Sequence, residues 1–452
     1  MIKSVSAIFA VALCVAGCDA VGPDFRRPDI PLQTSFSFQG KDALEDAARA
    51  QWWKGLDDPV LDELMARALS QNLELKVAVA RIEQARAQLR SSGTLTQLSG
   101  SVSGQAYVGA SGGRSSDTVI IEAEPVFVLD LFGENRRRRE AAAAGVNTAV
   151  FEAAAAQLAL QLQLVNSYSD LRYFQALERL RQRSIANEIE VVSAVRRREN
   201  LQHESKLTLR RAEAELQLKR ADVPASQQGQ IEAILGISTL LAQPYEEMQK
   251  TLSRRRAQPH PPQNISPGVP AALLKNRPDV RAAEAAFAAA VAQVGVAEAQ
   301  LYPSLRLNGQ LTATQGGALS FGPTLSVPVF GRAARVAGKD LAVARALEAE
   351  LMWRDTVLVS IEEVQLGLAE LNNTDKQVAA LNNAASKFRD VAELSMEAFR
   401  LQAITFVDVL DVEDSLTQSE LQLINAKWSN ARAWARLNVA IGLGWQNIDG
   451  EY

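Results

Sequence analysis

Very few side chains of this 452-residue chain have the type and spacing that chemistry requires. Asp408 and Asp411 lie three residues apart, and on a helix this spacing puts both carboxylates on one face. Such a pair can concentrate cations and repel anions, or it can simply interact with the dipole of a helix start. Two His and two Cys are too few for a zinc site, a thiol redox pair or a His-based catalytic dyad. We therefore predict that the protein is not an enzyme.

The amino terminus contains the one cysteine to which we assign a role. A basic residue, an apolar run and small residues precede Cys18, an order typical of a secretory signal peptide over residues 1–17. Val15-Ala16-Gly17-Cys18 resembles the bacterial lipobox, whose cysteine is acylated and becomes the first residue after cleavage. The alternative is an ordinary signal peptide with an incidental cysteine. We predict a diacylglycerol and an N-acyl chain on Cys18, which together give a stable membrane anchor, and no other cofactor.

Composition indicates long helices. Hydrophobic residues make up 47% and charged residues 22%, whereas aromatic residues make up only 6%, and long tracts are rich in Ala, Leu, Gln, Glu and Arg. The net charge of −4 gives no positive field for a polyanion, so we expect no nucleic-acid partner. After Cys18 we identify no apolar stretch of the ~20 residues typical of a transmembrane helix. A membrane-spanning part would then have to be a β-barrel.

The two halves of the chain resemble each other. Gly133 and Gly331 each end a short apolar segment before a long helical tract, at an offset of 198 residues (331 − 133). Glu213 and Glu413 begin similar segments at an offset of 200 (413 − 213). Similar offsets in the same order predict two structural copies. Each copy should contain a helix, a strand pair and two long helices.

Two segments of the second copy alternate between apolar and polar residues. The apolar set recurs at every second position from Leu305 to Ala313 and from Leu319 to Val329, and mostly small polar residues lie between its members. This period of two is typical of strands with one face toward lipid and one toward water. The alternative is the edge of a soluble sandwich.

The first copy alternates less clearly, over residues 102–110 and 119–131. On a barrel strand, Glu122 and Glu124 would have to face the lumen. Four strands cannot close a barrel alone, so several protomers would have to contribute strands.

The last helical tract has two packing seams. From Val409 to Ala440, mostly apolar residues recur at spacings of three and four, which predicts a left-handed supercoil with a neighbouring helix. A second seam runs from Leu421 to Ala435, and a polar stripe separates the two. The stripe consists of Asp408, Asp411, Ser415, Gln418, Gln422, Asn425, Ser429, Arg432 and Arg436. A wall of helices around water would show such a stripe, and a coiled coil with one solvated face is the alternative.

Several motifs together resemble those of the outer membrane factors, the efflux duct lipoproteins of the TolC and OprM type, and more narrowly the NodT type of resistance-nodulation-division (RND) systems. The resemblance covers nearly the whole mature chain. The motifs are Trp52-Trp53 with Asp58-Pro59, Leu129-Asp130-Leu131-Phe132-Gly133, Arg277-Pro278-Asp279-Val280 and Asp408-Val409-Leu410-Asp411.

The resemblance implies an α+β fold in a homotrimer. Each protomer would give four strands to a shared transmembrane β-barrel in the bacterial outer membrane lipid and long helices to a periplasmic α-barrel. It also implies a passive duct that exports drugs or other small molecules, loaded by a periplasmic adaptor and an inner-membrane pump of the RND type. The alternatives are the exit duct of a type I protein secretion system and a structural coiled-coil lipoprotein that spans the periplasm.

The resemblance also implies functional residues at the periplasmic tip. The positions matching Asp408 and Asp411 form acidic rings in such ducts, and threefold symmetry would bring six carboxylates together, which should raise their pKa values. The family usually has Gly in the turns between the long helices. In this chain the turns, which would face the adaptor, fall at Leu201, Gln202, Leu401 and Gln402.

These observations predict the division of the chain. The predicted segments are a signal peptide at 1–17, a lipidated equatorial segment at 18–60, a first repeat at 61–258 with a strand pair near 98–131 and long helices at 133–241, a linker at 259–270, a second repeat at 271–442 with a strand pair at 304–329 and long helices at 331–442, and a carboxyl-terminal segment at 443–452.

Overall fold

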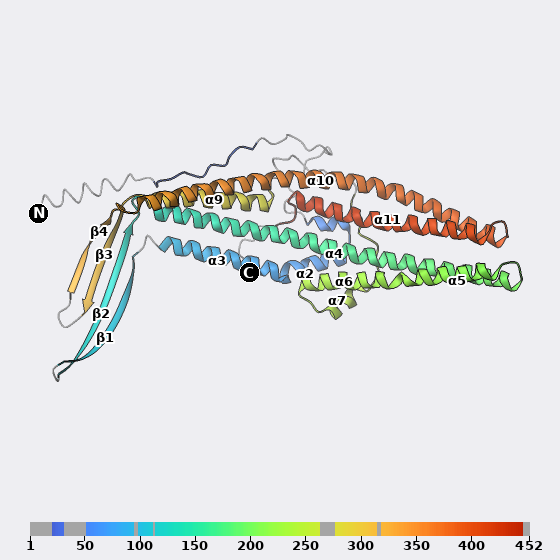
Figure 1. The fold of residues 1–452 in the computed structure, drawn as a ribbon, viewed down its shortest axis with the longest axis horizontal. Helices are drawn as coiled ribbons and strands as arrows, with labels where there is room; N and C mark the ends of the chain where they lie inside the picture. The colour runs from blue at the N-terminus through green and yellow to red at the C-terminus, as the bar shows by residue number, and fades with distance from the viewer. Residues whose placement is uncertain are drawn as a thin grey trace.

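A computed structural model describes residues 20–30, 51–94, 98–111, 114–262, 276–313 and 318–445. The signal peptide, Cys18 and most of the linker and of the carboxyl-terminal segment lie outside the described residues. The molecule is elongated, with a β-sheet at one end and a long helical body that extends away from it (Figure 1).

Two helices run along the helical body. α4 (Glu134–Asn200) has 67 residues and α10 (Arg332–Arg400) has 69 residues, which corresponds to ~100 Å each at 1.5 Å per residue. Neither contains proline, so no hydrogen bond of either helix is lost to a ring. Gly133 and Gly331 precede them with φ of 76° and 74°, a left-handed conformation that favours glycine. α4 ends at Asn200, directly before the turn that the sequence predicts at Leu201 and Gln202.

Shorter helices pack along these two. They are η2 (Trp52–Leu56), α2 (Pro59–Gln71), α3 (Leu73–Thr94), α5 (Lys206–Ala221), α6 (Val223–Leu241), α7 (Tyr245–Leu252), α9 (Pro278–Ala299) and α11 (Phe406–Ala440). α9 contacts both α4 and α10, and α11 contacts the same two helices. The second long helix expected in the first copy is divided into α5 and α6, because Pro224 has no amide hydrogen for a helix interior. The Arg220 carbonyl, four residues before Pro224, accepts instead from the Asp222 N–H, and the Asp222 carbonyl at the break accepts a hydrogen bond from Arg181.

Two of the helices are more apolar than the sequence analysis assumed. α4 and α9 each contain an 18-residue window with a mean hydropathy of 1.2 and 1.3, long and apolar enough to cross a membrane by length and composition alone. Half of each window is buried in the protein, and the two helices pack against each other. Their many alanines therefore serve helix packing, because small side chains allow helices to approach closely.

Four antiparallel strands form the sheet, in the order β1-β2-β3-β4. The strands are β1 (Ser99–Ser111), β2 (Arg114–Leu129), β3 (Ser304–Ala313) and β4 (Ala318–Ser326). β2 pairs with β3, so the sheet joins the two halves of the chain. The second-copy strands lie where the alternation predicts them, except that β4 ends at Ser326, before Val327 and Val329.

The strand register separates an apolar face from a polar face. Residues opposite each other on antiparallel strands point to the same side, and one row across the sheet reads Val102, Ala123, Leu311 and Leu319. The next row, on the other face, reads Ser103, Glu122, Thr312 and Ala318. Glu122 therefore faces away from the apolar side, as the sequence analysis required. On the apolar face the side chains are uncovered, and Leu319 and Phe321 are 73% and 72% exposed.

The largest hydrophobic cluster lies near the middle of the helical body. η2, α2, α6 and α7 pack there against α4, α10 and α11. Trp52 and Trp53 are buried in this cluster, and the Trp52 ring lies edge-on to Trp434 with 5.4 Å between ring centroids. Burial raises the pKa of Tyr168, whose hydroxyl is hydrogen-bonded to Asp58. The two adjacent tryptophans are thus packing residues.

Candidate functional site

The end of the helical body farthest from the sheet consists of two similar turns (Figure 1). One joins α4 to α5, and its Gln202 has a φ of 62°. The backbone N–H of Gln202 donates to the Glu199 carbonyl, and that of His203 donates to the Arg198 carbonyl. These two hydrogen bonds satisfy the last carbonyls of α4 and form a Schellman motif, in which the residue with the left-handed conformation is usually glycine.

The second turn repeats this geometry between α10 and α11. Gln402 has a φ of 64°, its N–H donates to the Phe399 carbonyl, and the Ala403 N–H donates to the Ala398 carbonyl. The left-handed conformation costs about 1 kcal/mol for a residue other than glycine. The missing family glycines therefore leave the shape of the turns intact, although glutamine occupies the strained position. Leu201 and Leu401 precede the two glutamines and are 68% and 74% exposed.

Arg198 connects the two turns, a role that the sequence analysis missed. Its Nη2 donates to the Phe399 carbonyl at 2.7 Å, and its guanidinium carbon lies 4.0 Å from the centroid of the Phe399 ring. Glu204 lies 3.7 Å from the other guanidinium nitrogen. The residue 200 positions later is Ala398, so repeat comparison gives no counterpart. The one sequence signal for Arg198 is its place among basic residues at the carboxyl end of α4, where a cation interacts favourably with the helix dipole.

Asp408 forms a capping box at the start of α11. The Thr405 backbone N–H donates to the Asp408 carboxylate at 2.7 Å, the Thr405 hydroxyl donates to the same oxygen at 2.6 Å, and the Asp408 N–H donates to that hydroxyl at 3.3 Å. The hydrogen bonds from the side chain and then the backbone of Thr405 lower the pKa of Asp408. Within one protomer this direction is opposite to the increase that the sequence analysis expected, because a hydrogen-bonded carboxylate is stabilised in its charged form.

Asp411 lies one turn further along α11, and its side chain is exposed like that of Asp408. The two residues begin the predicted polar stripe, whose nine side chains are all exposed or half-buried. Along the first predicted seam, every side chain except half-buried Val412 is buried, because this side of α11 packs on α10 and α4. The helix thus has a packed side and a polar side, and both acidic residues belong to the polar side.

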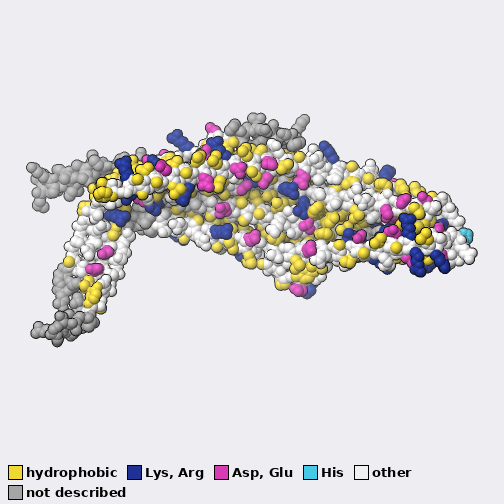
Figure 2. Space-filling model, viewed as in Figure 1, with side chains coloured by type: hydrophobic (Ala, Val, Ile, Leu, Met, Phe, Trp, Pro, Cys, Tyr) yellow, Lys and Arg dark blue, Asp and Glu magenta, His cyan; other side chains and the backbone are white. Residues whose placement is uncertain are grey.

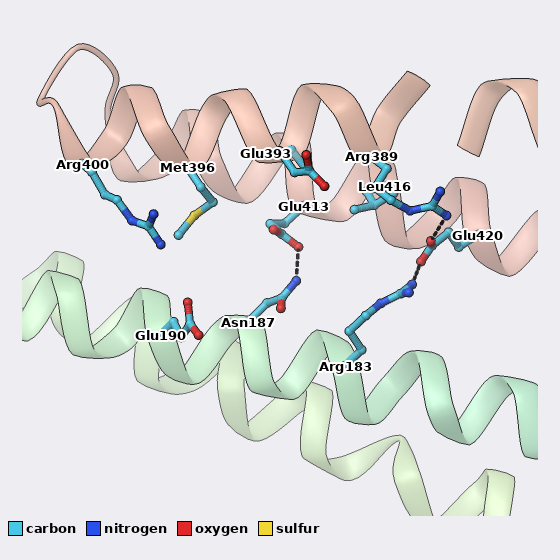
Figure 3. Close-up of a pocket in the computed structure, with 11 residues that line it drawn as sticks. Arg183, Asn187, Glu190, Arg389, Glu393, Met396, Arg400, Glu413, Leu416 and Glu420 are labelled. Carbon is cyan, nitrogen blue, oxygen red and sulfur yellow. Dashed lines mark hydrogen bonds and ion pairs between the residues drawn. The ribbon is translucent and has the colours of Figure 1, made fainter. Parts of the chain in front are cut away.

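A cavity of about 410 Å³ lies between α4 and the α10–α11 pair, on the sheet side of the tip (Figure 3). Glu420 of α11 forms ion pairs with Arg183 of α4 and, at 2.8 Å, with Arg389 of α10. Asn187 donates to the Glu413 carboxylate at 3.3 Å. Burial and the neighbouring Arg389 lower the pKa of Arg183. The cavity therefore contains a charged network that connects the first half of the chain to the second.

The described residues do not form a metal site. Among them, no group of three or more His, Cys, Asp or Glu side chains could hold a metal ion. Cys18, the predicted lipidation residue, lies outside the described part of the chain.

Known proteins resemble this chain over almost its entire length. The family described as "Outer membrane efflux protein" matches residues 269–443. Nodulation protein T of Rhizobium leguminosarum bv. trifolii is 30% identical over 97% of both chains. The pyoverdine export outer membrane protein OpmQ of Pseudomonas aeruginosa is 24% identical over 92% of both. The solved structure of the outer-membrane channel OprN superposes with a TM-score of 0.86 at 29% identity, over 94% of this chain and 99% of that one.

These similarities agree with the geometry. The superposition with the OprN channel covers 94% of this chain, so the fold of a small sheet joined to very long helices is shared with that channel. The relative at 30% identity covers nearly the whole chain, so the relation is not confined to one segment. The protein belongs to the outer membrane efflux protein family, the outer membrane factors of the TolC type.

Proposed function

We propose that this protein is the outer membrane duct of a tripartite efflux system, in which three copies form one passive channel for small molecules. The observation that carries the proposal is the four-stranded sheet, with an uncovered apolar face on one side and a polar face on the other. Lipid would cover the apolar face, and water in the lumen would contact the polar face.

The edges of the sheet support a shared barrel. Among the described residues, β1 pairs only with β2 and β4 only with β3. A sheet in a bilayer cannot leave the backbone groups of its edges without hydrogen bonds. Three copies that pair β1 of one with β4 of the next would close a barrel of twelve strands (3 × 4), with no free edge.

The surface of α10 supports the same assembly. Large apolar side chains are exposed along this helix, and hydrophobic side chains cover much of the helical body in the space-filling view (Figure 2). They include Leu341, Val343, Leu347, Leu351, Met352, Leu358, Val359 and Leu366. An apolar strip of this length is typical of a surface that another chain covers. A neighbouring protomer is the occupant that a closed helical barrel provides.

The tip is the proposed gate and contact point. Asp408 and Asp411 of three protomers would form acidic rings around the lumen, which would concentrate cations at the entrance. Exposed Leu201 and Leu401, with Gln202 and Gln402, are the proposed contacts for a periplasmic adaptor. An RND pump in the inner membrane would supply the energy, and acyl chains on Cys18 would anchor the duct in the outer membrane.

Single-channel conductance of the purified trimer in a planar bilayer tests this proposal. We expect a small, cation-selective conductance for the wild type. In the Asp408→Ala/Asp411→Ala variant, selectivity should fall or conductance should rise, because the acidic rings are removed. Asp390→Ala/Asp414→Ala is the control, since it removes the same charge from exposed positions outside the polar stripe. Equal effects of both variants would contradict the gate, and a correctly folded trimer without conductance would contradict the duct.

A further inference from the structure

A run of four arginines, Arg136–Arg139, lies at the start of α4, where the helical body meets the sheet. Arg136 and Arg139 have exposed side chains, as expected for a solvated helix start. Arg137 does not: its side chain is only 6% exposed. A buried guanidinium needs several acceptors to offset its loss of water.

The acceptors come from the first residues that the structure describes. Arg137 Nε donates to the Val21 carbonyl at 3.1 Å, and Nη2 donates to the Gly22 carbonyl at 3.1 Å and to the Asp24 carboxylate at 2.9 Å. Nη1 donates to Glu140 on the next turn of α4 at 2.8 Å. The side chain thus binds the backbone of a segment more than 110 residues away in sequence. We call residues 20–24 together with Arg137 the amino-terminal socket.

Three glycines make room for this contact. A Cβ atom on Gly22, whose φ is 91°, would lie 2.4 Å from the Cα of Gly295 in α9. A Cβ on Gly133 would lie 2.3 Å from the Cβ of Ala20, and one on Gly295 would lie 2.8 Å from the Arg137 side chain. Distances below 3.0 Å are not tolerated between such atoms. The close approach of the segment to α4 and α9 is therefore built into the sequence at three separate positions.

A backbone hydrogen bond attaches the segment to the end of the sheet region. The Val21 N–H donates to the Phe132 carbonyl at 3.1 Å, directly before α4 begins. Beyond the socket, the Phe25 ring lies edge-on to Phe287 of α9 with 5.3 Å between ring centroids. Residues 20–24 are thus held on both sides of the junction between the sheet and the helices.

We propose that Arg137 is a positioning residue for the lipid anchor: the socket that it forms holds the acylated amino terminus against the base of the sheet. Cys18 precedes Ala20 by two residues in the sequence, and two residues of extended chain reach no further than ~7 Å. A fixed Ala20 therefore fixes where the acyl chains can enter the membrane. The inference rests on the lipid anchor of the proposed function, and the socket itself is independent of export.

The primary test compares Arg137→Gln with Arg139→Gln, which changes an exposed arginine of the same run. Hydrogen–deuterium exchange of the trimer in vesicles reports on the Val21 amide. We expect at least tenfold faster exchange over residues 19–25 in Arg137→Gln, and wild-type exchange in Arg139→Gln. Trypsin should also cleave after Arg26 faster in Arg137→Gln and release the acylated fragment, whereas the Arg27–Pro28 bond resists trypsin in both proteins. Unchanged exchange and cleavage in Arg137→Gln would overturn the socket.

A second measurement separates positioning of the anchor from a purely structural role. Metabolic labelling with a diazirine fatty acid places a photoreactive chain on Cys18, and crosslinks are mapped on peptides that carry this residue. In the wild type these crosslinks should reach the base of the sheet, and in Arg137→Gln their yield should fall at least fivefold while the melting temperature of the trimer is kept. An equal yield in both proteins would contradict the positioning role.

Two further variants keep the outcomes distinct. If Arg137→Gln does not fold, Gly22→Ala dislodges the segment while Arg137 stays in place, and the same rise in exchange is expected. Cys18→Ser should leave the socket protected, because its hydrogen bonds do not involve the acyl chains. If mass spectrometry finds no acyl chain on Cys18, the anchor fails but the exchange result still decides the socket. Loss of conductance would concern only the proposed duct.

Discussion

Thr405 determines how Asp408 responds to acid. The pKa of Asp408 is lowered from its ordinary value of 3.8 because Thr405 donates hydrogen bonds to the carboxylate. A lowered folded-state pKa means that this stabilisation is fully present above the ordinary value and is lost as the pH falls through the lowered pKa. We therefore expect the start of α11 to exchange amide hydrogens at a constant protection factor from neutral pH to about 4, and to lose protection below it.

The Thr405→Ala variant tests this assignment. It should move the pKa of Asp408, measured by NMR titration, back toward the ordinary value and reduce helix stability by about 1 kcal/mol. Ser205→Ala is the matched control, because Ser205 caps α5 through the Thr208 N–H at 3.1 Å without an acidic partner. Its loss of stability should not depend on pH in the acidic range. A pKa of Asp408 above the ordinary value in the assembled trimer would show that repulsion between the rings exceeds the capping interaction.

Residues whose roles depend on local spacing could be identified from the sequence more readily than residues whose partners lie far away along the chain. Gln202 and Gln402 lie in the two turns and Asp408 and Asp411 in the first turns of α11, since turn and helix-start signals act over a few residues. The role of the two aspartates as a gate remains a prediction. Arg137 could not be singled out from its basic run, because the groups that accept its hydrogen bonds lie more than 110 residues earlier in the chain. The roles of Cys18 as lipid anchor and of the tip residues as adaptor contacts remain predictions.

At the scale of helices, Glu420 connects α11 to both long helices. Its carboxylate is 8% exposed and pairs with Arg183 and Arg389, which are about half exposed. Glu420→Gln should destabilise the part of the helical body near the tip, because two neighbouring guanidinium groups would lose their shared anion. We expect a loss of only about 1–2 kcal/mol, because both guanidinium groups also contact water, which weakens the ion pairs. Thermal unfolding followed by circular dichroism measures the change.

Glu393→Gln is the control for this prediction. Glu393 lines the same cavity and is exposed, so its change should leave the melting temperature within about 1 °C. Similar melting of both variants would mean that hydrophobic packing between α4 and α11 holds the two halves together without help from the ion pairs. Protection of α11 amides would then be equal in the two variants.

Helices and strands could be predicted from the sequence where a single period of apolar residues continues through a long segment. The seam of α11 was readable because one side of this helix is buried along its length, and the alternation of β3 was readable because every second side chain points to the same face of the sheet. The division between α5 and α6 had a visible signal in Pro224, but the surrounding helical pattern obscured it. The apolar windows of α4 and α9 were missed because alanine contributes to hydropathy while it serves helix packing.

At the scale of the whole molecule, the two faces of the sheet decide whether the protein can assemble in a membrane. Leu311→Arg places a charge on the apolar face, which should cost ~2–4 kcal/mol per protomer near the middle of the bilayer. We expect loss of the proposed trimer in native gel electrophoresis of outer membrane extracts.

The adjacent position on the same strand provides the control. Gln310 lies on the polar face, opposite Ser320, so Gln310→Arg should leave the trimer intact and alter only ion selectivity. Equal loss of trimer in the two variants would contradict the assignment of the faces. The number of copies follows from neither the sequence nor one protomer, because it depends on contacts between chains, and the trimer remains our proposal.

The continuous length of α4 and α10 fixes the distance between the two ends of the protein. Two uninterrupted helices of 67 and 69 residues separate the sheet from the turns, so the distance between them is set by residue number. Adding seven residues to both, and seven to each of the returning helices α5 and α11 that pack along them, would lengthen the body by about 10 Å and keep every seam in register. Adding five would rotate each tip relative to its own sheet. Evolution of this length should therefore proceed in steps of whole heptads, taken by all four helices together, and in concert with the width of the compartment between the two membranes.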